Sequence, residues 1–224
     1  MKFKNIMKYK ELFKDVSEDQ FERIKNYLNA NRFTDKDYSN FYDRLKELSS
    51  IEWNYLKIVL DIIPEATPRP RLDRKGYFYV TNSKKNNNFV KQLIISNLDI
   101  FHLISTPCNY IVNAYFPIPK YFSKVDTILA ELGLYSKITM PDWDNVGKTY
   151  SDMIQKWILC NDTLIIKGEV NKLYSLKPRV EIIIEYMNNH FSKHDQRLIE
   201  QSISYKKEVD NYEYFKAEKD KLQN

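Results

Sequence analysis

Pro141-Asp142-Trp143-Asp144-Asn145 is the stretch around which the rest of this chain is organised. Lys148 follows it closely, and Asp162 lies 18 residues after Asp144. Mg²⁺ and Mn²⁺ take hard oxygen ligands in near-octahedral geometry, and carboxylates commonly share that task with phosphate oxygens and water. An Asp-x-Asp pair, a nearby lysine and a third carboxylate therefore predict a metal-dependent nuclease site.

The segment after the aspartates has the apolar spacing of a helix that buries one stripe. The pattern predicts a helix from Asn145 to Leu159, with these residues on the buried side: Val146, Tyr150, Met153, Ile154, Trp157 and Ile158. Lys148 and Asp152 lie one turn apart on the other side. An ammonium there can contact the scissile phosphate, and Asp152 can hold that ammonium in place.

An ordinary helix cap is the alternative interpretation of Asp142 to Asn145. Asp accepts hydrogen bonds from the free N–H groups of a first turn and suits the helix dipole. Lys148 and Asp162 are not explained by capping, so the wider set of residues favours the chemical interpretation.

The length of the predicted helix bears on how Asp162 reaches the other carboxylates. Fifteen residues span roughly 22 Å, which separates Asp162 from Asp142 and Asp144 within one chain. Either the helix stops early, near Gln155, and the chain doubles back, or two subunits pack antiparallel about a two-fold axis. We favour the second arrangement, in which each site combines residues of both chains.

The run from Pro141 to Tyr186 resembles the RusA family of Holliday-junction resolvases. The matching residues are Asp142, Asp144, Lys148, Asp152, Asn161-Asp162 and Lys177-Pro178-Arg179-Val180-Glu181-Ile182. Upstream, Pro68-Arg69-Pro70-Arg71, Pro117-Ile118-Pro119-Lys120 and Ser123-Lys124 are similar to versions of the family found on phages and prophages. The similarity covers roughly residues 53–186.

The resemblance implies a homodimeric, Mg²⁺-dependent endonuclease that makes paired cuts in four-way DNA junctions. It assigns metal and catalytic roles to Asp142, Asp144 and Asp162, and a catalytic role to Lys148. Two positions depart from the family pattern. Asn161 stands where relatives usually carry an acid, and Gly147 lies near the helix start, where glycine weakens a helix by up to about 1 kcal/mol relative to Ala.

Composition limits the class of protein. The chain has 224 residues, 43% of them hydrophobic and 29% charged, which suits one substantial core. The sequence has no run of 18 apolar residues and a lysine-rich start, so we expect neither a membrane span nor a secretory signal. Cys108 and Cys160, the only two cysteines, are expected to be buried, reduced residues of a cytoplasmic protein without structural zinc.

Positive charge is concentrated in one stretch. Residues 64–91 contain seven Lys or Arg and two acids, a difference equal to the +5 net charge of the whole chain. Such a segment, interleaved with aromatic residues, is typical of a phosphate-contacting arm, although a solvated loop is the alternative. The predicted DNA-binding residues are Arg69, Arg71, Arg74, Lys75, Lys84, Lys85, Lys120 and Lys124.

The remaining patterns predict an α+β protein: about four strands in a mixed sheet, with helices packed on one side, assembled as a symmetric homodimer. Residues 1–50 form an appended helical segment, with capping boxes beginning at Ser17 and Thr34, whose apolar stripes pack on the core or on a partner helix. Residues 51–188 form the nuclease core and residues 189–224 a charged helical tail. Within the core, the sequence predicts strands at 52–62, 110–116, 163–173 and 180–187, the last two as a pair, and a hairpin near Gly76. It also predicts a helix at 86–103 and a second one from Ser123, which makes a capping pair with Asp126, to Gly133. The apolar stripe of this second helix consists of Val125, Ile128, Leu129 and Leu132.

These predictions together favour a Mg²⁺-dependent endodeoxyribonuclease, with Mn²⁺ as an alternative metal and no small-molecule cofactor. Its expected partners are branched DNA and a second copy of the chain. Two alternatives remain: a non-catalytic DNA-binding or regulatory protein that keeps the fold, and a nuclease for another branched or single-stranded DNA. Junction preference resides in dimer geometry and DNA shape, which the sequence does not display.

Overall fold

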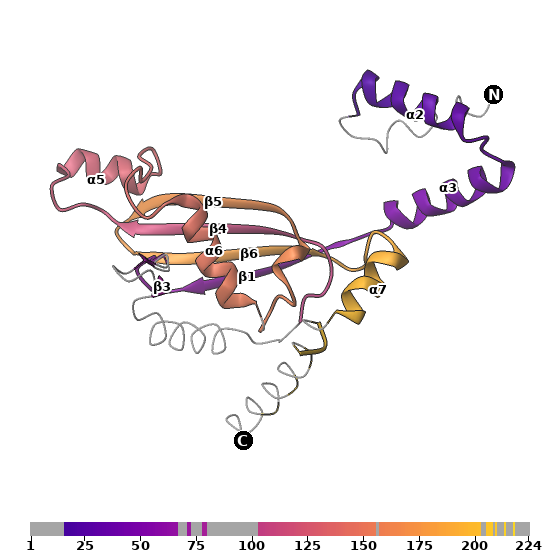
Figure 1. Ribbon diagram of the computed structural model, residues 1–224. Helices are drawn as coiled ribbons and strands as arrows, with labels where there is room; N and C mark the ends of the chain where they lie inside the picture. The colour runs from indigo at the N-terminus through magenta and orange to yellow at the C-terminus, as the bar shows by residue number, and fades with distance from the viewer. Residues whose placement is uncertain are drawn as a thin grey trace. The chain divides into compact units, whose positions relative to one another are not determined.

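The computed structural model describes residues 16–66, 71–72, 78–79, 103–155, 157–202, 205–207, 209, 213 and 217 (Figure 1). The chain divides into two compact units, Met1–Glu52 and Trp53–Asn224. No helix among these described residues is long and apolar enough to span a bilayer.

The first unit contains helices α2 (Glu18–Ala30) and α3 (Asp35–Ser49). Both predicted capping boxes are present: Ser17 accepts a hydrogen bond from the N–H of Gln20, and Thr34 accepts one from the N–H of Asp37. Each cap satisfies N–H groups that the first helical turn leaves without partners. The two helices therefore begin where the sequence predicted.

The second unit is built on a four-stranded sheet with the order β1-β6-β4-β5. Its strands are β1 (Trp53–Leu60), β4 (Cys108–Pro117), β5 (Ile165–Ser175) and β6 (Arg179–Met187). β4 pairs in parallel with β5 and antiparallel with β6, while β1 pairs antiparallel with β6. The prediction of an α+β fold with a mixed sheet of about four strands is confirmed.

The prediction that the last two strands form a pair is wrong, because β4 lies between them. Alternation along β6 fully buries Val180, Ile182 and Ile184 on one face, and the strand takes an interior position between β1 and β4. β5 is reached from β4 through helices, the kind of crossover that parallel neighbours require. The short link at 176–178 consequently passes beyond the end of β4.

One face of this sheet carries the core. Alternation along β4 buries Cys108, Tyr110, Val112, Ala114 and Phe116. Helix α6 (Trp143–Ile154) lies across the same sheet in Figure 1 and contacts both β4 and β5. Its buried residues include Val146, Tyr150, Met153 and Ile154, as predicted. Cys108 and Cys160 are both free and buried, and burial raises the pKa of Cys108 to about 12.

Helix α6 ends at Ile154 and not at Leu159, which is the early stop near Gln155 given above as one of two alternatives. Gln155 adopts an extended conformation, and the N–H groups of Trp157, Ile158 and Leu159 all donate to the carbonyl of Ile154 at 3.2, 2.9 and 3.1 Å. Ile158 and Leu159 are still fully buried, but they enter the core from this turn. The apolar spacing continues past the end of the helix because the residues of the following turn are also buried. Periodicity alone does not distinguish a longer helix from a helix followed by a buried turn.

Helix α5 (Lys124–Glu131) begins with the predicted Ser123 capping box and is followed by Gly133 at φ 76°. A positive φ is adopted readily only by glycine, which explains the stop at this position. The predicted apolar stripe of α5 is largely exposed, with Val125, Ile128 and Leu132 all more than 60% accessible. Ala130 is its one buried residue.

Smaller elements complete the described part of the chain. Strands β2 (Arg71–Leu72) and β3 (Phe78–Tyr79) pair antiparallel, in agreement with the predicted hairpin. Helix α7 (Lys193–Gln201) begins at Ser192, whose side chain accepts from the N–H of Asp195, and its Ile199 packs against the core. The predicted helix at 86–103 lies outside the described residues, except for Leu103.

Candidate active site

Asp142 and Asp144 lie at the N-terminus of α6. Asp142 occupies the cap position, and its carbonyl accepts the first helical hydrogen bond, from Val146 at 3.1 Å. Its side chain makes no capping hydrogen bond within α6, whereas Ser17, Thr34 and Ser123 each cap the helix that follows them. Both carboxylates are exposed, so the helix start presents two acidic groups to solvent. Capping alone therefore does not account for the Asp-x-Asp pair.

Lys148 lies one turn into α6, on its exposed side. Its Nζ is 3.8 Å from a carboxylate oxygen of Asp152, and both side chains are largely accessible. This is the contact predicted from their spacing. An exposed i,i+4 ion pair contributes less than about 0.5 kcal/mol, so its effect is to restrict where the ammonium lies more than to stabilise the helix.

Gly147 is explained by how closely α6 approaches the sheet. A Cβ atom at this position would lie 2.8 Å from Cγ2 of Val170 on β5, which is closer than atoms of this kind normally come. The hydroxyl of Tyr110 on β4 also donates to the Gly147 carbonyl at 3.3 Å. Glycine lowers the helix propensity at this position, but it allows the close packing that fixes the N-terminal part of α6 against β5.

The loop that leads into Asp142 is held by two lysines that sequence reasoning missed. Lys137 Nζ donates to the hydroxyl of Thr139, and Lys172 Nζ on β5 donates to the Thr139 carbonyl, both at 2.7 Å. Lys137 also lies over the Phe116 ring at 5.0 Å. Burial, followed by repulsion from Lys172, lowers the pKa of Lys137 below its ordinary value. The sequence carried no signal for this arrangement, because it depends on the loop pairing with the far end of β5.

Asp162 lies at the opposite end of α6 along the chain. It begins a short 3-10 turn, η2 (Asp162–Leu164), which leads directly into β5, and its side chain is exposed. Asn161 caps this turn, since its side-chain oxygen accepts from the N–H of Thr163 at 3.0 Å. An amide performs this task as well as a carboxylate, which gives the departure from the family pattern at this position a local structural role.

The described contacts keep Asp162 away from the α6 N-terminus within one chain. Val170 lies against Gly147, and Ile165, near Asp162, is five residues earlier on the same strand, or about 16 Å at the usual strand rise. At the other end, Leu159 is hydrogen-bonded to the last residue of α6. In agreement with this separation, the described residues contain no group of three or more His, Cys, Asp or Glu that could hold a metal ion. The structure brings Asp142, Asp144 and Lys148 together, and leaves Asp162 apart.

Three of the eight predicted DNA-binding residues lie in the described part of the chain. Lys120 and Lys124 flank the start of α5 and are exposed. Arg71 lies on β2, opposite Tyr79 of β3. Arg69, Arg74, Lys75, Lys84 and Lys85 lie outside the described residues.

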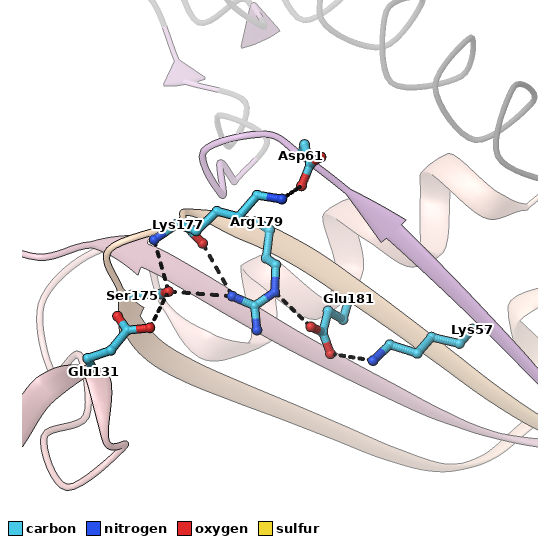
Figure 2. A network of polar contacts seen from close by, with 7 residues as sticks. All are labelled: Lys57, Asp61, Glu131, Ser175, Lys177, Arg179 and Glu181. Atoms are coloured by element: carbon cyan, nitrogen blue, oxygen red, sulfur yellow. Dashed lines mark hydrogen bonds and ion pairs between the residues drawn. The ribbon is translucent and has the colours of Figure 1, made fainter.

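A separate network of charged side chains lies on the sheet (Figure 2). The Glu181 carboxylate on β6 accepts from Lys57 Nζ at 2.9 Å and from Arg179 Nε at 2.7 Å. The Arg179 guanidinium also stacks on the Tyr115 ring, 3.6 Å from its centre. Burial alone would raise the pKa of Glu181, but the hydrogen bonds from Lys57 and Arg179 outweigh it and lower that pKa. The same bond raises the pKa of Lys57.

The network continues into the turn that joins β5 to β6. The Ser175 hydroxyl donates to Glu131 at the end of α5 at 3.2 Å and accepts from Arg179, as Figure 2 shows. Lys177 pairs with Asp61, just after β1, at 3.4 Å. These contacts tie the β5–β6 link to α5 and to the segment just after β1, so these charges serve the scaffold and leave the Asp-x-Asp pair as the candidate site.

Comparison with known proteins identifies the family of this chain. Residues 61–185, more than half of the chain, match the family described as endodeoxyribonuclease RusA. The chain is also 33% identical over 126 residues to the uncharacterized protein YqaN of Bacillus subtilis strain 168, a match that covers 54% of this chain and 89% of that protein. Asp142, Asp144, Lys148 and Asp162 all fall inside the family match. The chain therefore belongs to the RusA family of endodeoxyribonucleases, the Holliday-junction resolvases.

Proposed function

We propose that this protein is a divalent-metal-dependent endonuclease that hydrolyses phosphodiesters at four-way DNA junctions and acts as a two-fold dimer. The observation that carries the proposal is the N-terminus of α6, where two exposed aspartates lie one turn before an exposed lysine. Membership of the RusA family supports the reaction class. The proposed metal is Mg²⁺, and Mn²⁺ has the same ligand preference.

The chemistry of the donors suits such a metal. Exposed carboxylates are hard oxygen ligands, and Mg²⁺ is commonly held by one or two of them together with water and substrate phosphate. Asp142 and Asp144 supply this pair, and Asp162 adds a third. When bound, the metal ion supplies Lewis-acid polarisation of the phosphate and a lowered pKa for a water nucleophile.

The remaining groups act on the phosphate directly. Lys148 places a positive charge where negative charge develops on the reacting phosphate, and Asp152 restricts the position of that ammonium. Gly147 lets β5 hold the first turn of α6, so the aspartates and Lys148 are carried on one rigid element. Lys172 fixes the loop that enters the site through its hydrogen bond to Thr139.

A dimer supplies what one chain lacks. Asp162 is on the order of 15 Å from the α6 N-terminus when the separation is counted along β5, whereas two ligands of one metal lie within a few ångströms of each other. Two chains related by a two-fold axis can each bring Asp162 to the partner's Asp142 and Asp144. Every site would then contain residues of both subunits.

Strand β5 offers the edge along which such a dimer can form. It is the last strand of the sheet, and residues 166–169, just after Asp162, are exposed on both faces. Loop residue Ser136 pairs with Leu173 farther along, so the first half of β5 is the open part of this edge in the described chain. Two β5 edges paired antiparallel around this half would carry Asp162 of one chain toward the segment of β5 that supports the partner's α6.

The test is a cleavage assay with the purified full chain. A labelled four-way junction, a replication-fork substrate and a matched linear duplex are incubated with and without Mg²⁺, and cutting is measured on each. We expect cutting that requires the metal and is fastest on the junction. Binding to the junction without cutting in either Mg²⁺ or Mn²⁺ would instead indicate a non-catalytic DNA-binding protein, and faster cutting of the fork would indicate a different branched substrate.

A further inference from the structure

The first unit contains an apolar groove that the nuclease site does not use. Helices α2 and α3 enclose a cleft of about 210 Å³ with an entirely apolar lining, formed by Val16, Phe21, Tyr27, Phe33, Phe41 and their neighbours. Three of the aromatic rings meet edge to face, with centres 6.3 Å apart for Tyr27 and Phe33 and 5.6 Å apart for Phe33 and Tyr38. The groove is therefore a preformed aromatic surface between two helices.

This unit requires a further element to cover it. Neither α2 nor α3 contains a single buried residue. Two helices spanning fewer than about 40 residues rarely bury enough apolar surface to be stable alone. Whatever occupies the groove thus contributes to the folding of the unit itself.

The net charge of the first unit indicates what kind of partner its groove would bind. Residues 16–52 contain eight acids and six basic residues, a net charge of −2 in a chain whose total is +5. DNA is a poor candidate, because an acidic surface repels phosphates and the lining offers no polar groups to them. The occupant is expected to be a basic segment with apolar anchors.

Residues 1–15 of this chain, which lie outside the described part, have that composition. They contain five lysines and two acids, a net charge of +3, together with the apolar residues Phe3, Ile6, Met7, Leu12 and Phe13. They are also covalently attached to the groove, because the residue that follows them, Val16, is part of its lining. Phe13 is three residues from Val16, so it cannot lie farther than about 11 Å away. A tether this short gives the segment a millimolar or higher effective concentration, which an external partner would have to exceed.

We propose that residues 1–15 occupy the apolar groove between α2 and α3, so that the first unit is completed by the chain's own N-terminal segment. The anchors are Leu12 and Phe13 together with the apolar residues before them. The lysines complement the acidic first turns of α2 and α3, which contain Glu18, Asp19, Asp35 and Asp37. The appended unit then closes on itself and does not extend the DNA-binding surface.

The test uses photo-crosslinking in the full chain. The photoreactive residue p-benzoylphenylalanine replaces Tyr27, and in a matched control it replaces Tyr55 of the second unit, because both tyrosines are 61% exposed. Equal amounts of ¹⁵N-labelled and unlabelled chains are mixed before irradiation, and the crosslinked peptides are identified by mass spectrometry. We expect position 27 to link to residues 1–15 of the same chain, independently of protein concentration, and position 55 not to do so.

A second variant tests whether the apolar anchors hold the segment. Replacing Leu12→Ser and Phe13→Ser together should lower the crosslinking yield at position 27 severalfold, because losing each apolar side chain weakens docking of the segment by about tenfold or more. Asn5→Ser, which changes neither a charge nor an apolar anchor of the same segment, should leave the yield unchanged. Crosslinks between differently labelled chains would show that a second copy fills the groove. Crosslinks to residues 53–224, or a yield insensitive to the double substitution, would also overturn the proposal.

Discussion

Asp142, Asp144 and Asp162 are exposed carboxylates on the outside of a well-packed core, so their charge can be removed without disturbing the fold. We expect Asp142→Asn, Asp144→Asn and Asp162→Asn each to abolish junction cutting. Junction binding should be unchanged or tighter, because each substitution removes a negative charge beside DNA phosphate. Cleavage and gel-shift assays on the same preparations measure the two effects.

Asp61→Asn is the matched control for these three variants. Asp61 is also an exposed aspartate, but it pairs with Lys177 at the end of the sheet. This variant should cut at the wild-type rate. Near wild-type turnover in any of the other three would show that the corresponding aspartate is not a ligand.

The position of Gly147, where α6 packs against β5, leads to a prediction about stability. Gly147→Ala should destabilise the protein by about 1 kcal/mol, since overpacking against Val170 costs about 1–3 kcal/mol and better helix propensity returns about 1. Urea unfolding measures the change. A Cβ at Gly168 on β5 would meet nothing within 4 Å, so Gly168→Ala serves as the control and should be neutral or slightly stabilising.

The double variant Gly147→Ala with Val170→Ala separates crowding from other causes. If the clash with Val170 is responsible, the two substitutions together should destabilise by less than the sum of the single effects. Additive effects would mean that Gly147 is required for another reason.

The contacts of Glu181 lead to a prediction about how the free energy of unfolding changes with pH. Its pKa is lowered in the folded state by Lys57 and Arg179, so it contributes stability that is present above the ordinary Glu value of 4.5 and is lost as the pH falls through its folded pKa. Because Lys57 is partly exposed, the loss is about 1 kcal/mol. Urea unfolding of the wild type and of Glu181→Gln at neutral pH and below pH 4.5 should show their difference in stability shrinking in acid. A difference independent of pH would contradict the assignment.

At the scale of elements, local signals were the most reliable guide. The capping boxes at Ser17, Thr34 and Ser123 marked three helix starts correctly, because a cap involves residues only three positions apart. The end of α6 was misplaced, since Trp157 and Ile158 extend the apolar spacing although the chain turns at Gln155. The pairing of β5 with β4 was also missed, because no local pattern distinguishes a strand's neighbours in a sheet.

The basic segment at 64–91 makes a prediction that depends only on charge. Replacing Arg69 and Arg71 together with Ala should weaken binding to junction and linear DNA alike, and lower the salt dependence of affinity by roughly one unit of slope for each lost phosphate contact. Fluorescence anisotropy at several salt concentrations measures this slope.

The control removes the same charge elsewhere. Arg23→Ala with Arg44→Ala affects two arginines of the acidic first unit, where they pair with Asp19 and Glu47. Its salt dependence should match the wild type. An unchanged slope for the Arg69 and Arg71 variant would mean that these arginines are structural, for example through pairing with Glu65 or Asp73.

At the scale of the molecule, the sequence indicated which residues belong to the candidate site, but it did not indicate how they are arranged in space. Spacing placed Asp142 and Asp144 just before a helix that starts at Asn145, with Lys148 in its first turns, whereas α6 begins at Trp143 and includes Asp144. The positions of Lys137 and Lys172 depend on a loop meeting a distant strand, and no spacing reveals that. For Asp162, the predicted helix length was wrong, yet the separation it implied persists because β5 carries the chain back alongside α6 only after Asp162.

That separation leads to the last prediction, which concerns assembly. Inactive Asp144→Asn protein is mixed with inactive Asp162→Asn protein under conditions that let subunits exchange, and junction cutting is followed over time. In a composite dimer, one site of each heterodimer contains the wild-type Asp142 and Asp144 of one chain and the wild-type Asp162 of the other. Exchange at equal concentrations makes half of the dimers heterodimers, and each heterodimer has one intact site of two. About a quarter of all sites are then intact, so the mixture should recover about a quarter of the activity of wild-type protein at the same total concentration.

The alternative arrangement predicts a different result from the same mixture. If all three aspartates acted within one chain, every subunit in the mixture would lack a ligand, and no activity would return however long exchange continued. Mixing Asp142→Asn with Asp144→Asn is the internal control, because both substitutions affect the same half of the composite site and each heterodimer site then keeps one defect. Recovery in the first mixture without recovery in the second would place Asp162 across the subunit boundary from the α6 aspartates.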